Sequence, residues 1–258
     1  MAARLADSPV PKALRWPLYR AFAAAVGADT GETERPLASY GTFDAFFTRR
    51  LRAGARRWPD DSSVAGSPVD GVVGRFGKVE DGAALQAKGR PYLVDELLGD
   101  ADLAARFAGG VYLTIYLAPR HYHRVHAPLA GALRTVRHVA GRLLPVNAPA
   151  VALVDRLFVS NERVACAIEG DSTAVAVVAV GALNVGRISV PAAPGWNPRA
   201  GIDRAHRYDP TPRLERGDEL MIFHLGSTVV LLFDGYRLAP GLRRGAEIRL
   251  GDPIAVKR

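Results

Sequence analysis

Three of the six histidines of this 258-residue chain, His121, His123 and His126, stand within six residues, directly after an apolar run. Alternate residues of a strand share one face, so His121 and His123 could hold a metal, although Arg120 and Arg124 would repel a cation. Imidazoles that titrate near neutrality also suit acid–base catalysis. A solvated loop with incidental histidines is the third interpretation. The spacing alone leaves all three open.

Asp70 and Ser227 stand in two further segments that combine a turn pattern with reactive side chains. Ser67-Pro68-Val69-Asp70-Gly71 contains turn formers, but a carboxylate there could also orient a histidine, as in a Ser-His-Asp triad. Leu225-Gly226-Ser227-Thr228 lies between two apolar runs, where glycine permits a hairpin or a bulge. A serine hydroxyl that follows glycine can also attack the preceding carbonyl, because glycine leaves that approach open.

Helical patterns occupy the first sixty residues. Residues 17–26 predict a short helix with Pro17 at its first position. Its apolar stripe consists of Leu18, Ala21, Phe22 and Ala25. Basic and aromatic neighbours suit a helix that lies in a membrane interface, although a helix packed on its own domain fits equally well. A second helix is predicted at residues 42–51.

Short β-rich runs with glycine and proline punctuation follow residue 60. They cover residues 71–76, 111–117, 157–159, 164–168, 174–180, 219–223 and 228–233. Residues 94–107 predict one helical insert. The pattern favours an α+β fold with a mainly β core, compact and barrel-like or sandwich-like. We expect an N-terminal helical, membrane-associating region at residues 1–60 and a β-rich catalytic core at residues 61–258.

The composition narrows the classes of partner and compartment. A formal net charge of +8 suits an anionic partner, either nucleic acid or an acidic membrane. Cys166 is the only cysteine, so an internal disulfide is impossible and a reducing compartment fits. The N-terminus lacks a signal-peptide pattern, and the longest apolar stretch, residues 174–183, is too short to span a bilayer. We therefore expect a soluble or peripheral protein.

These segments together resemble the phosphatidylserine decarboxylase family of bacterial and mitochondrial type. The matching segments, in order, are Phe46-Phe47-Thr48-Arg49; Ser67 to Gly71; Gln86-Ala87-Lys88-Gly89 with Tyr92 and Leu97-Leu98-Gly99; Tyr116 to Pro128; Val146-Asn147; Leu157 to Val164; Val180-Gly181-Ala182 with Val185-Gly186; and Leu225-Gly226-Ser227-Thr228. The resemblance covers nearly the whole chain from about residue 40. It departs at His121, where the family usually has an acidic residue.

The resemblance implies a zymogen of a pyruvoyl-dependent phosphatidylserine decarboxylase, a carboxy-lyase. Asp70, His126 and Ser227 would form a charge-relay set for autocatalytic cleavage between Gly226 and Ser227. Ser227 would become the covalent pyruvoyl cofactor, which forms a Schiff base with the substrate and converts phosphatidylserine to phosphatidylethanolamine. His123 would deliver a proton or hold the substrate carboxylate. The resemblance implies no metal.

The implied partners follow from the same resemblance. Cleavage would give a β chain of residues 1–226 and an α chain of residues 227–258, which stay associated. The substrate would be a phospholipid, and the binding surface would be an anionic membrane. The protein would be bound peripherally at the cytoplasmic side of the cell membrane. Nucleic acid is not expected as a partner, and a homodimer is allowed. The alternatives are a family member acting on a soluble amino acid or another amino-acid lipid, a non-catalytic β-barrel binding module, and a conventional serine hydrolase.

Overall fold

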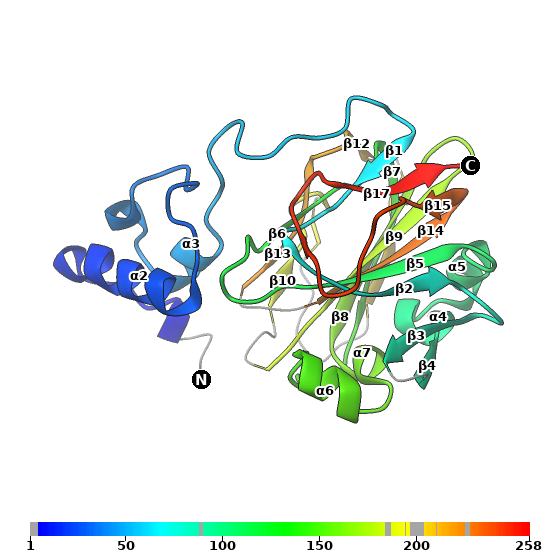
Figure 1. Cartoon of the computed structure of the whole chain (residues 1–258), viewed down its shortest axis with the longest axis horizontal. Coiled ribbons are helices and arrows are strands. Elements are labelled where there is room, and N and C mark those ends of the chain that lie inside the picture. Colours follow the sequence, from blue (N-terminus) through cyan, green and yellow to red (C-terminus); the bar gives the residue numbers. More distant parts are fainter. Residues whose placement is uncertain are drawn as a thin grey trace.

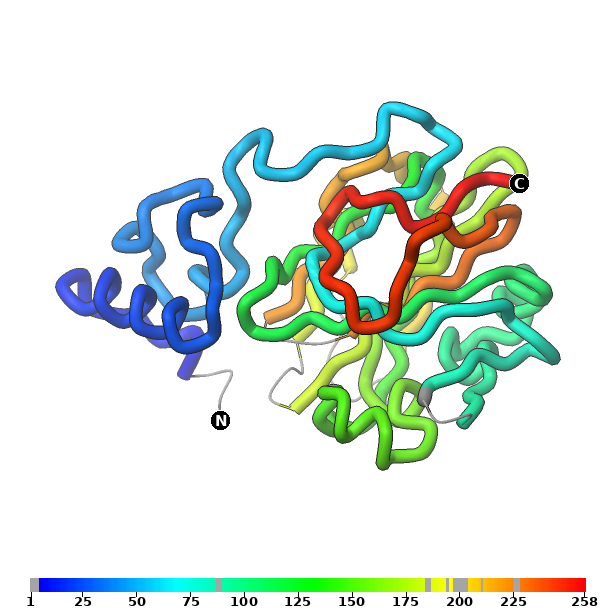
Figure 2. The backbone as a smooth tube through the Cα atoms, viewed as in Figure 1, coloured from blue at the N-terminus to red at the C-terminus, as the bar shows by residue number. Residues whose placement is uncertain are grey.

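A helical N-terminal region and a larger body of strands lie side by side in the computed structural model of the chain (Figure 1). The structure describes residues 5–87, 90–183, 187–193, 195–196, 204–209, 211–224 and 228–258. One extended stretch, light blue in Figure 2, leads from the helical region to the strands. Within the described residues, no helix is both long and apolar enough to cross a membrane.

The described helices are short, apart from the first. They are α2 (Lys12–Val26), the 3-10 helix η1 (Leu37–Ser39), α3 (Phe43–Phe47), α4 (Val94–Leu98), α5 (Ala101–Arg106), α6 (Ala148–Leu153) and α7 (Leu157–Ser160). In the N-terminal region, Tyr19 of α2 stacks on Phe46 of α3 with ring centroids 4.6 Å apart. The Tyr19 hydroxyl donates to the Tyr40 carbonyl at 3.1 Å. This aromatic cluster gives the region a small core of its own.

The strands make up most of the regular structure. They are β1 (Val64–Gly66), β2 (Gly71–Lys78), β3 (Ala83–Ala87), β4 (Arg90–Leu93), β5 (Val111–Tyr116), β6 (Arg124–His126), β7 (Gly131–Val139), β8 (Arg163–Glu169), β9 (Ala174–Val180), β10 (Ile188–Ser189), β11 (Arg204–Arg207), β12 (Arg213–Leu214), β13 (Glu219–Phe223), β14 (Thr228–Asp234), β15 (Tyr236–Leu238), β16 (Glu247–Ile248) and β17 (Pro253–Lys257).

The main sheet is antiparallel and runs in the order β11-β7-β8-β9-β14-β5-β2-β16, with β12 also paired to β7. Smaller sheets join β1-β17-β15, β10-β13-β6 and β3-β4. The predicted α+β, mainly β class is confirmed. Within the described part of the chain the main sheet ends at β11 and β16, so it does not close into a barrel.

Side chains from both faces of the central strands are buried. In β9 and β14 successive residues point to opposite faces, and each face packs into a separate apolar cluster. This two-sided burial explains why these strands are continuously apolar in sequence rather than alternating. Residues 228–258 also supply β16 to β2 and β17 to β1, so the segment that follows the predicted cleavage position is built into two sheets.

Four predicted elements differ from the structure. The helix predicted at residues 42–51 is shorter and spans Phe43–Phe47. The first helix begins at Lys12, and Pro17 lies inside it, where one backbone hydrogen bond is lost but the buried Tyr19 and Ala23 hold the helix against its region. Residues 157–159 form α7 rather than a strand, because so short an apolar run fits either structure. Residues 94–107 form two helices, separated at Gly99, which adopts a left-handed φ of 65°.

The sequence boundary near residue 60 stays a prediction. The helices α2 and α3 precede it and β1 follows it.

Candidate active site

The histidine-rich segment connects β5 to β6, and neighbouring strands hold it in place. β6 pairs with β13, while the backbone N–H of His126 donates to the Pro68 carbonyl at 2.9 Å. The backbone N–H of Phe223, at the end of β13, donates to the His123 carbonyl at 3.0 Å. The histidines therefore lie beside the turn that carries Asp70 and beside the strand that leads to residues 225–227.

His126 has a defined tautomer. Its Nδ1 lies 2.7 Å from the carbonyl oxygen of Gly217, which can only accept, so Nδ1 carries the proton. Its Nε2 then accepts from the Tyr122 hydroxyl at 3.1 Å. Burial lowers the pKa of His126, so the imidazole is neutral near pH 7 and presents a basic Nε2. This is the state that a general base requires.

The Asp70 carboxylate is bound by a cation rather than by His126. Arg56 donates to it through both Nε, at 2.9 Å, and Nη2, and the backbone N–H of Leu250 donates at 2.7 Å. Arg56 also donates to Glu32 at 2.8 Å. Among the described residues no hydrogen bond joins Asp70 to His126. The charge-relay role assigned to this pair stays a prediction.

The side chain of His123 is fully buried and packs on Phe47 of α3, with ring centroids 4.1 Å apart. Its Nδ1 donates to the carbonyl of His121 at 2.8 Å, so Nε2 is the unprotonated nitrogen. Burial lowers the pKa of His123 to about 3. Nε2 is buried and has no hydrogen-bond partner among the described residues. An unsatisfied buried acceptor is costly, and functional sites are where such groups recur.

His121, the residue that departs from the family pattern, is tied into the surrounding structure. Its Nδ1 accepts from the backbone N–H of Ala118 at 2.8 Å, and its Nε2 donates to Glu247 at 3.0 Å. Glu247 also pairs with Arg120. Both ring nitrogens of His121 are therefore engaged, and the described residues contain no group of three or more His, Cys, Asp or Glu side chains that could hold a metal.

Gly226 and Ser227 lie outside the described residues. Their described neighbours on the two sides are His224 and Thr228. Thr228 opens β14, which pairs with Tyr116 of β5 on one side and with Val180 of β9 on the other. The start of the predicted α chain is thus fixed beside the end of β5, from which the histidine segment begins.

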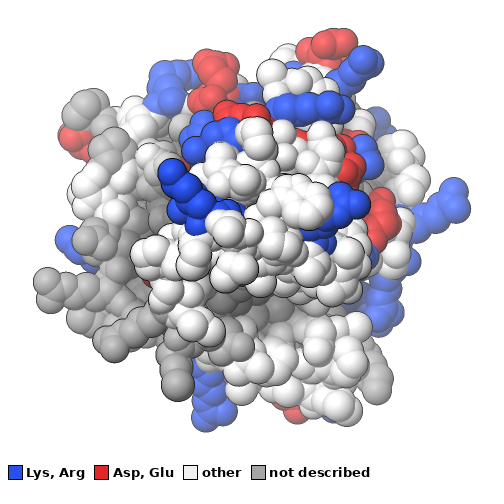
Figure 3. Space-filling model, turned by 90° about the vertical axis from the view of Figure 1, so that its left-hand side faces the viewer, with Lys and Arg blue, Asp and Glu red and all other residues white. Residues whose placement is uncertain are grey.

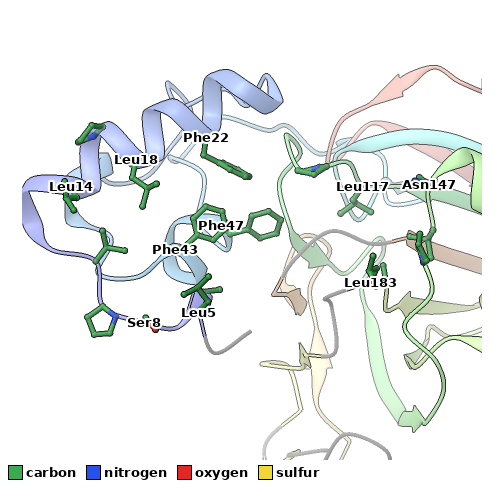
Figure 4. Close-up of a pocket in the computed structure, with 18 of the residues that line it drawn as sticks. Leu5, Ser8, Leu14, Leu18, Phe22, Phe43, Phe47, Leu117, Asn147 and Leu183 are labelled. Atoms are coloured by element: carbon green, nitrogen blue, oxygen red, sulfur yellow. The ribbon is translucent and has the colours of Figure 1, made fainter. Parts of the chain in front are cut away.

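A large apolar cavity of about 1080 Å³ lies between the N-terminal helices and the strands. Figure 4 shows Leu14, Leu18 and Phe22 of α2 on one side of it and Leu117 and Leu183 on the other. Figure 3 looks onto this end of the molecule, where uncharged residues form much of the surface and Lys and Arg gather mainly above them. The cavity has the shape and lining that suit a hydrocarbon chain.

A smaller cavity of about 330 Å³ adjoins the first, because Tyr116 and Val146 line both. Its wall includes Gln86 and Thr228, both almost fully buried. The Gln86 amide nitrogen donates to two backbone carbonyls, at 3.0 and 2.7 Å, and its oxygen has no partner among the described residues. The same holds for the Thr228 hydroxyl. The smaller cavity thus places a few polar groups in a mainly apolar wall, which suits the polar end of an amphiphilic ligand.

Arg75 and Arg244 also line the smaller cavity, and the buried Arg75 Nε has no hydrogen-bond partner among the described residues. These two cations make it suitable for an anionic group. Sequence reasoning identified neither arginine, nor Arg56 or Glu247, because nothing in the local patterns around them distinguishes them from ordinary surface residues.

The neutral, fully buried His123 packs on Phe47, which lines the large apolar cavity, so a group that can carry a proton lies beside a space that suits an apolar ligand. Residues 43–256 match the family model described as phosphatidylserine decarboxylase. A relative from Anaeromyxobacter sp. (strain K), named phosphatidylserine decarboxylase proenzyme, is 46% identical over 96% of this chain and 88% of its own length. Relatives of the same name from Myxococcus xanthus and Azotobacter vinelandii are 42% and 44% identical, over 99% and 98% of this chain and 91% of their own lengths. The chain belongs to the phosphatidylserine decarboxylase family and is a carboxy-lyase.

Replacing Arg56 by alanine should destabilise the protein by about 3–5 kcal/mol, because it leaves the buried Asp70 carboxylate without its cation. The hydrogen bond from Arg56 lowers the pKa of Glu32 despite burial. Ionised Glu32 therefore stabilises the fold above its unfolded pKa, and this contribution is lost as pH falls through the folded pKa. The free energies of unfolding of the wild type and of Arg56→Ala, measured with denaturant, should consequently differ less below about pH 4 than at pH 7.

The control is Arg57→Ala, which removes an exposed arginine one residue along the chain. A loss of stability as large as that of Arg56→Ala, or a difference from the wild type that does not shrink in acid, would contradict the assigned ion pair.

Proposed function

We propose that this chain is the precursor of a pyruvoyl-dependent enzyme that cleaves itself between Gly226 and Ser227 and then decarboxylates phosphatidylserine to phosphatidylethanolamine. The observation that carries the substrate assignment is the apolar cavity that adjoins, at Tyr116, a smaller cavity lined in part by Arg75 and Arg244, beside the first residue of β14. The names of the relatives support the same reaction and a proenzyme form.

In the proposed self-cleavage, the neutral His126 takes the hydroxyl proton of Ser227, and the Ser227 Oγ attacks the Gly226 carbonyl carbon. An ester replaces the peptide bond. Loss of the Ser227 α-proton then expels the Gly226 carboxylate and leaves dehydroalanine at the new N-terminus. Tautomerisation and hydrolysis release ammonia and leave the pyruvoyl group.

Asp70 supports this step through charge and through position. Its carboxylate favours the imidazolium that forms when His126 accepts a proton, and it also fixes its turn through Arg56 and Leu250. The carbonyl of Pro68 in the same turn accepts a hydrogen bond from the backbone N–H of His126, which places this residue relative to the turn.

The described residues fit a pyruvoyl group at the start of β14. The Thr228 hydroxyl and the His123 Nε2 are buried polar atoms that have no partner within the described part of the chain, as expected beside a site that a substrate completes. A pyruvoyl group supplies an electrophilic keto carbonyl, which can hold the electrons left when carbon dioxide departs.

His123 has the tautomer of a proton carrier. Its Nε2 is the nitrogen that can carry a proton, and because burial lowers the pKa of His123 to about 3, an imidazolium formed there readily gives that proton to the substrate carbon. A bare nitrogen cannot donate to a carboxylate, so the proton-transfer role fits this geometry better than the alternative of holding the substrate carboxylate.

The N-terminal helices support a membrane-borne substrate. On α2 the side chains of Leu14, Trp16 and Leu18 are exposed, and the Arg20 guanidinium lies 5.4 Å from the Trp16 ring. Exposed apolar and aromatic residues with basic neighbours suit a helix that lies in an anionic membrane interface. We infer peripheral binding at the cytoplasmic side of the cell membrane; a homodimer stays a prediction.

Intact mass of the purified protein should reveal two chains, residues 1–226 and 227–258, the shorter one lighter than its sequence by one ammonia. Ser227→Ala, His126→Ala and Asp70→Ala should leave the precursor whole, because each removes a group that the first step uses. A single uncleaved chain in a preparation that decarboxylates would overturn the pyruvoyl proposal. Normal cleavage of His126→Ala would remove the general-base role.

Vesicles that contain phosphatidylserine should release carbon dioxide at a rate at least about 100-fold above that with free serine at equal concentration, because the acyl chains contribute binding energy in the apolar cavity. Vesicles of phosphatidylcholine alone are the blank. Equal rates with free serine would favour the alternative of a soluble amino-acid decarboxylase.

His123→Gln should still cleave itself, whereas decarboxylation by the mature enzyme should fall by about 100-fold or more, as expected when a proton-transfer group is lost. The matched control is His206→Gln, which makes the same replacement at an exposed histidine of β11. Carbon dioxide release should be expressed per pyruvoyl group. An unchanged rate per pyruvoyl group would exclude His123 from proton transfer.

A further inference from the structure

Asp44, Ser189 and His224 form a hydrogen-bonded Ser-His-Asp chain, which the proposed chemistry does not use. The carboxylate oxygens of Asp44 lie 2.9 and 3.0 Å from the His224 Nδ1. The Ser189 Oγ lies 3.0 Å from the His224 Nε2. Asp44 lies in α3, Ser189 lies in β10, and His224 directly follows β13. These hydrogen bonds therefore join the N-terminal region to the strands.

The His224 Nδ1 lies between the Asp44 carboxylate, which only accepts, and the Arg187 Nη2, which only donates. With the proton on Nδ1, the imidazole donates to Asp44 and its Nε2 accepts from the Ser189 hydroxyl; with the proton on Nε2, it donates to Ser189 and Nδ1 accepts from Arg187. In either tautomer the ring links Ser189 to the charged residues. Neither Ser189 nor His224 lines the two cavities described above, which leaves the serine without a substrate space there. The arrangement therefore serves to hold segments together rather than to attack a ligand.

Arg187 and Asp7 complete the charges that face this chain. Arg187 pairs with Asp44 at 2.9 Å and with Asp7 at 3.0 Å, while its Nη2 lies 2.8 Å from the His224 Nδ1. The Asp44 carboxylate thus lies within hydrogen-bonding distance of both Arg187 and the His224 Nδ1. Although burial opposes it, hydrogen bonding and charge from His224 and Arg187 lower the pKa of Asp44, which keeps that carboxylate ionised.

His224 stands directly before the predicted cleavage segment. Residues 225–227, with the predicted scissile bond, follow His224 directly. The backbone N–H of His224 donates to the Arg187 carbonyl at 3.2 Å, so both the backbone and the side chain of His224 are hydrogen-bonded. The same helix α3 that supplies Asp44 also supplies Phe47, which packs on His123. One helix therefore contacts both the residue that directly precedes the cleavage segment and a proposed catalytic histidine.

We propose that Asp44, His224 and Ser189 form a positioning latch that fixes the start of the cleavage segment and so couples the N-terminal helical region to self-cleavage. The inference rests on the proposed self-cleavage at Gly226-Ser227. His224 and Asp44 act as positioning residues, because a displacement of about 1 Å at a reacting centre can cost two orders of magnitude in rate.

The test is the half-time of self-cleavage of freshly synthesised full-length chain, followed by intact mass, with the midpoint of thermal unfolding measured for each variant. His224→Ala and Asp44→Ala should each slow cleavage by roughly 10- to 100-fold. The double variant should be no slower than either single variant, because both remove the same interaction. Asp155→Asn, which breaks the exposed Arg90–Asp155 pair, is the control and should cleave at the wild-type rate.

Rescue separates positioning from general destabilisation. His224→Asn keeps an N–H donor that can reach Asp44, so it should cleave at least several-fold faster than His224→Ala, whereas His224→Leu should not. Ser189→Thr should likewise cleave faster than Ser189→Ala. Equal rates for His224→Asn and His224→Leu, or wild-type rates for His224→Ala, would overturn the latch while leaving the proposed function intact. A wild-type chain that never cleaves would overturn both.

Discussion

The two-sided burial of β14 is the constraint on which the rest of the site depends. This strand is hydrogen-bonded to β5 and β9, and its side chains alternate between two apolar clusters. A shift of one residue would send every side chain to the wrong face, so its register is strongly fixed. Thr228 is thereby held beside Tyr116, where the two cavities meet. A chain cut just before β14 keeps this geometry, because the strand is anchored by the sheet rather than by its covalent link.

Burial also sets the chemistry of the histidines. Removing His123 and His126 from water disfavours their charged forms, and a backbone carbonyl at each Nδ1 fixes the tautomer. Both rings consequently present an unprotonated Nε2: that of His126 accepts from Tyr122, and that of His123 has no partner among the residues that the structure describes. A neutral base suits both proposed reactions. His121 is different, since both of its nitrogens are occupied and it ties the segment to Glu247.

The N-terminal region has two connections to the strands besides the covalent one. It forms one wall of the apolar cavity, and through α3 it contacts His123 and His224. The region that carries the surface suited to a membrane interface thus also contacts a proposed catalytic histidine. This arrangement gives a physical route by which the position of the N-terminal helices can affect both maturation and access of a lipid to the site.

The amino-acid sequence by itself determined the family and the apolar central strands such as β9 and β14, because an ordered series of motifs and continuous apolar runs are local properties of the chain. It did not reveal β7, where arginine and histidine side chains interrupt the apolar run. It could not separate helix from strand at Leu157–Ser160, where four residues satisfy both patterns. Only the tertiary structure decided that Asp70 binds Arg56, that Asp44 reaches His224, and that Gln86 and Thr228 share a cavity. Hydrogen-bond partners are chosen within a few tenths of an ångström among groups that packing brings together, and no local spacing in the chain encodes those distances.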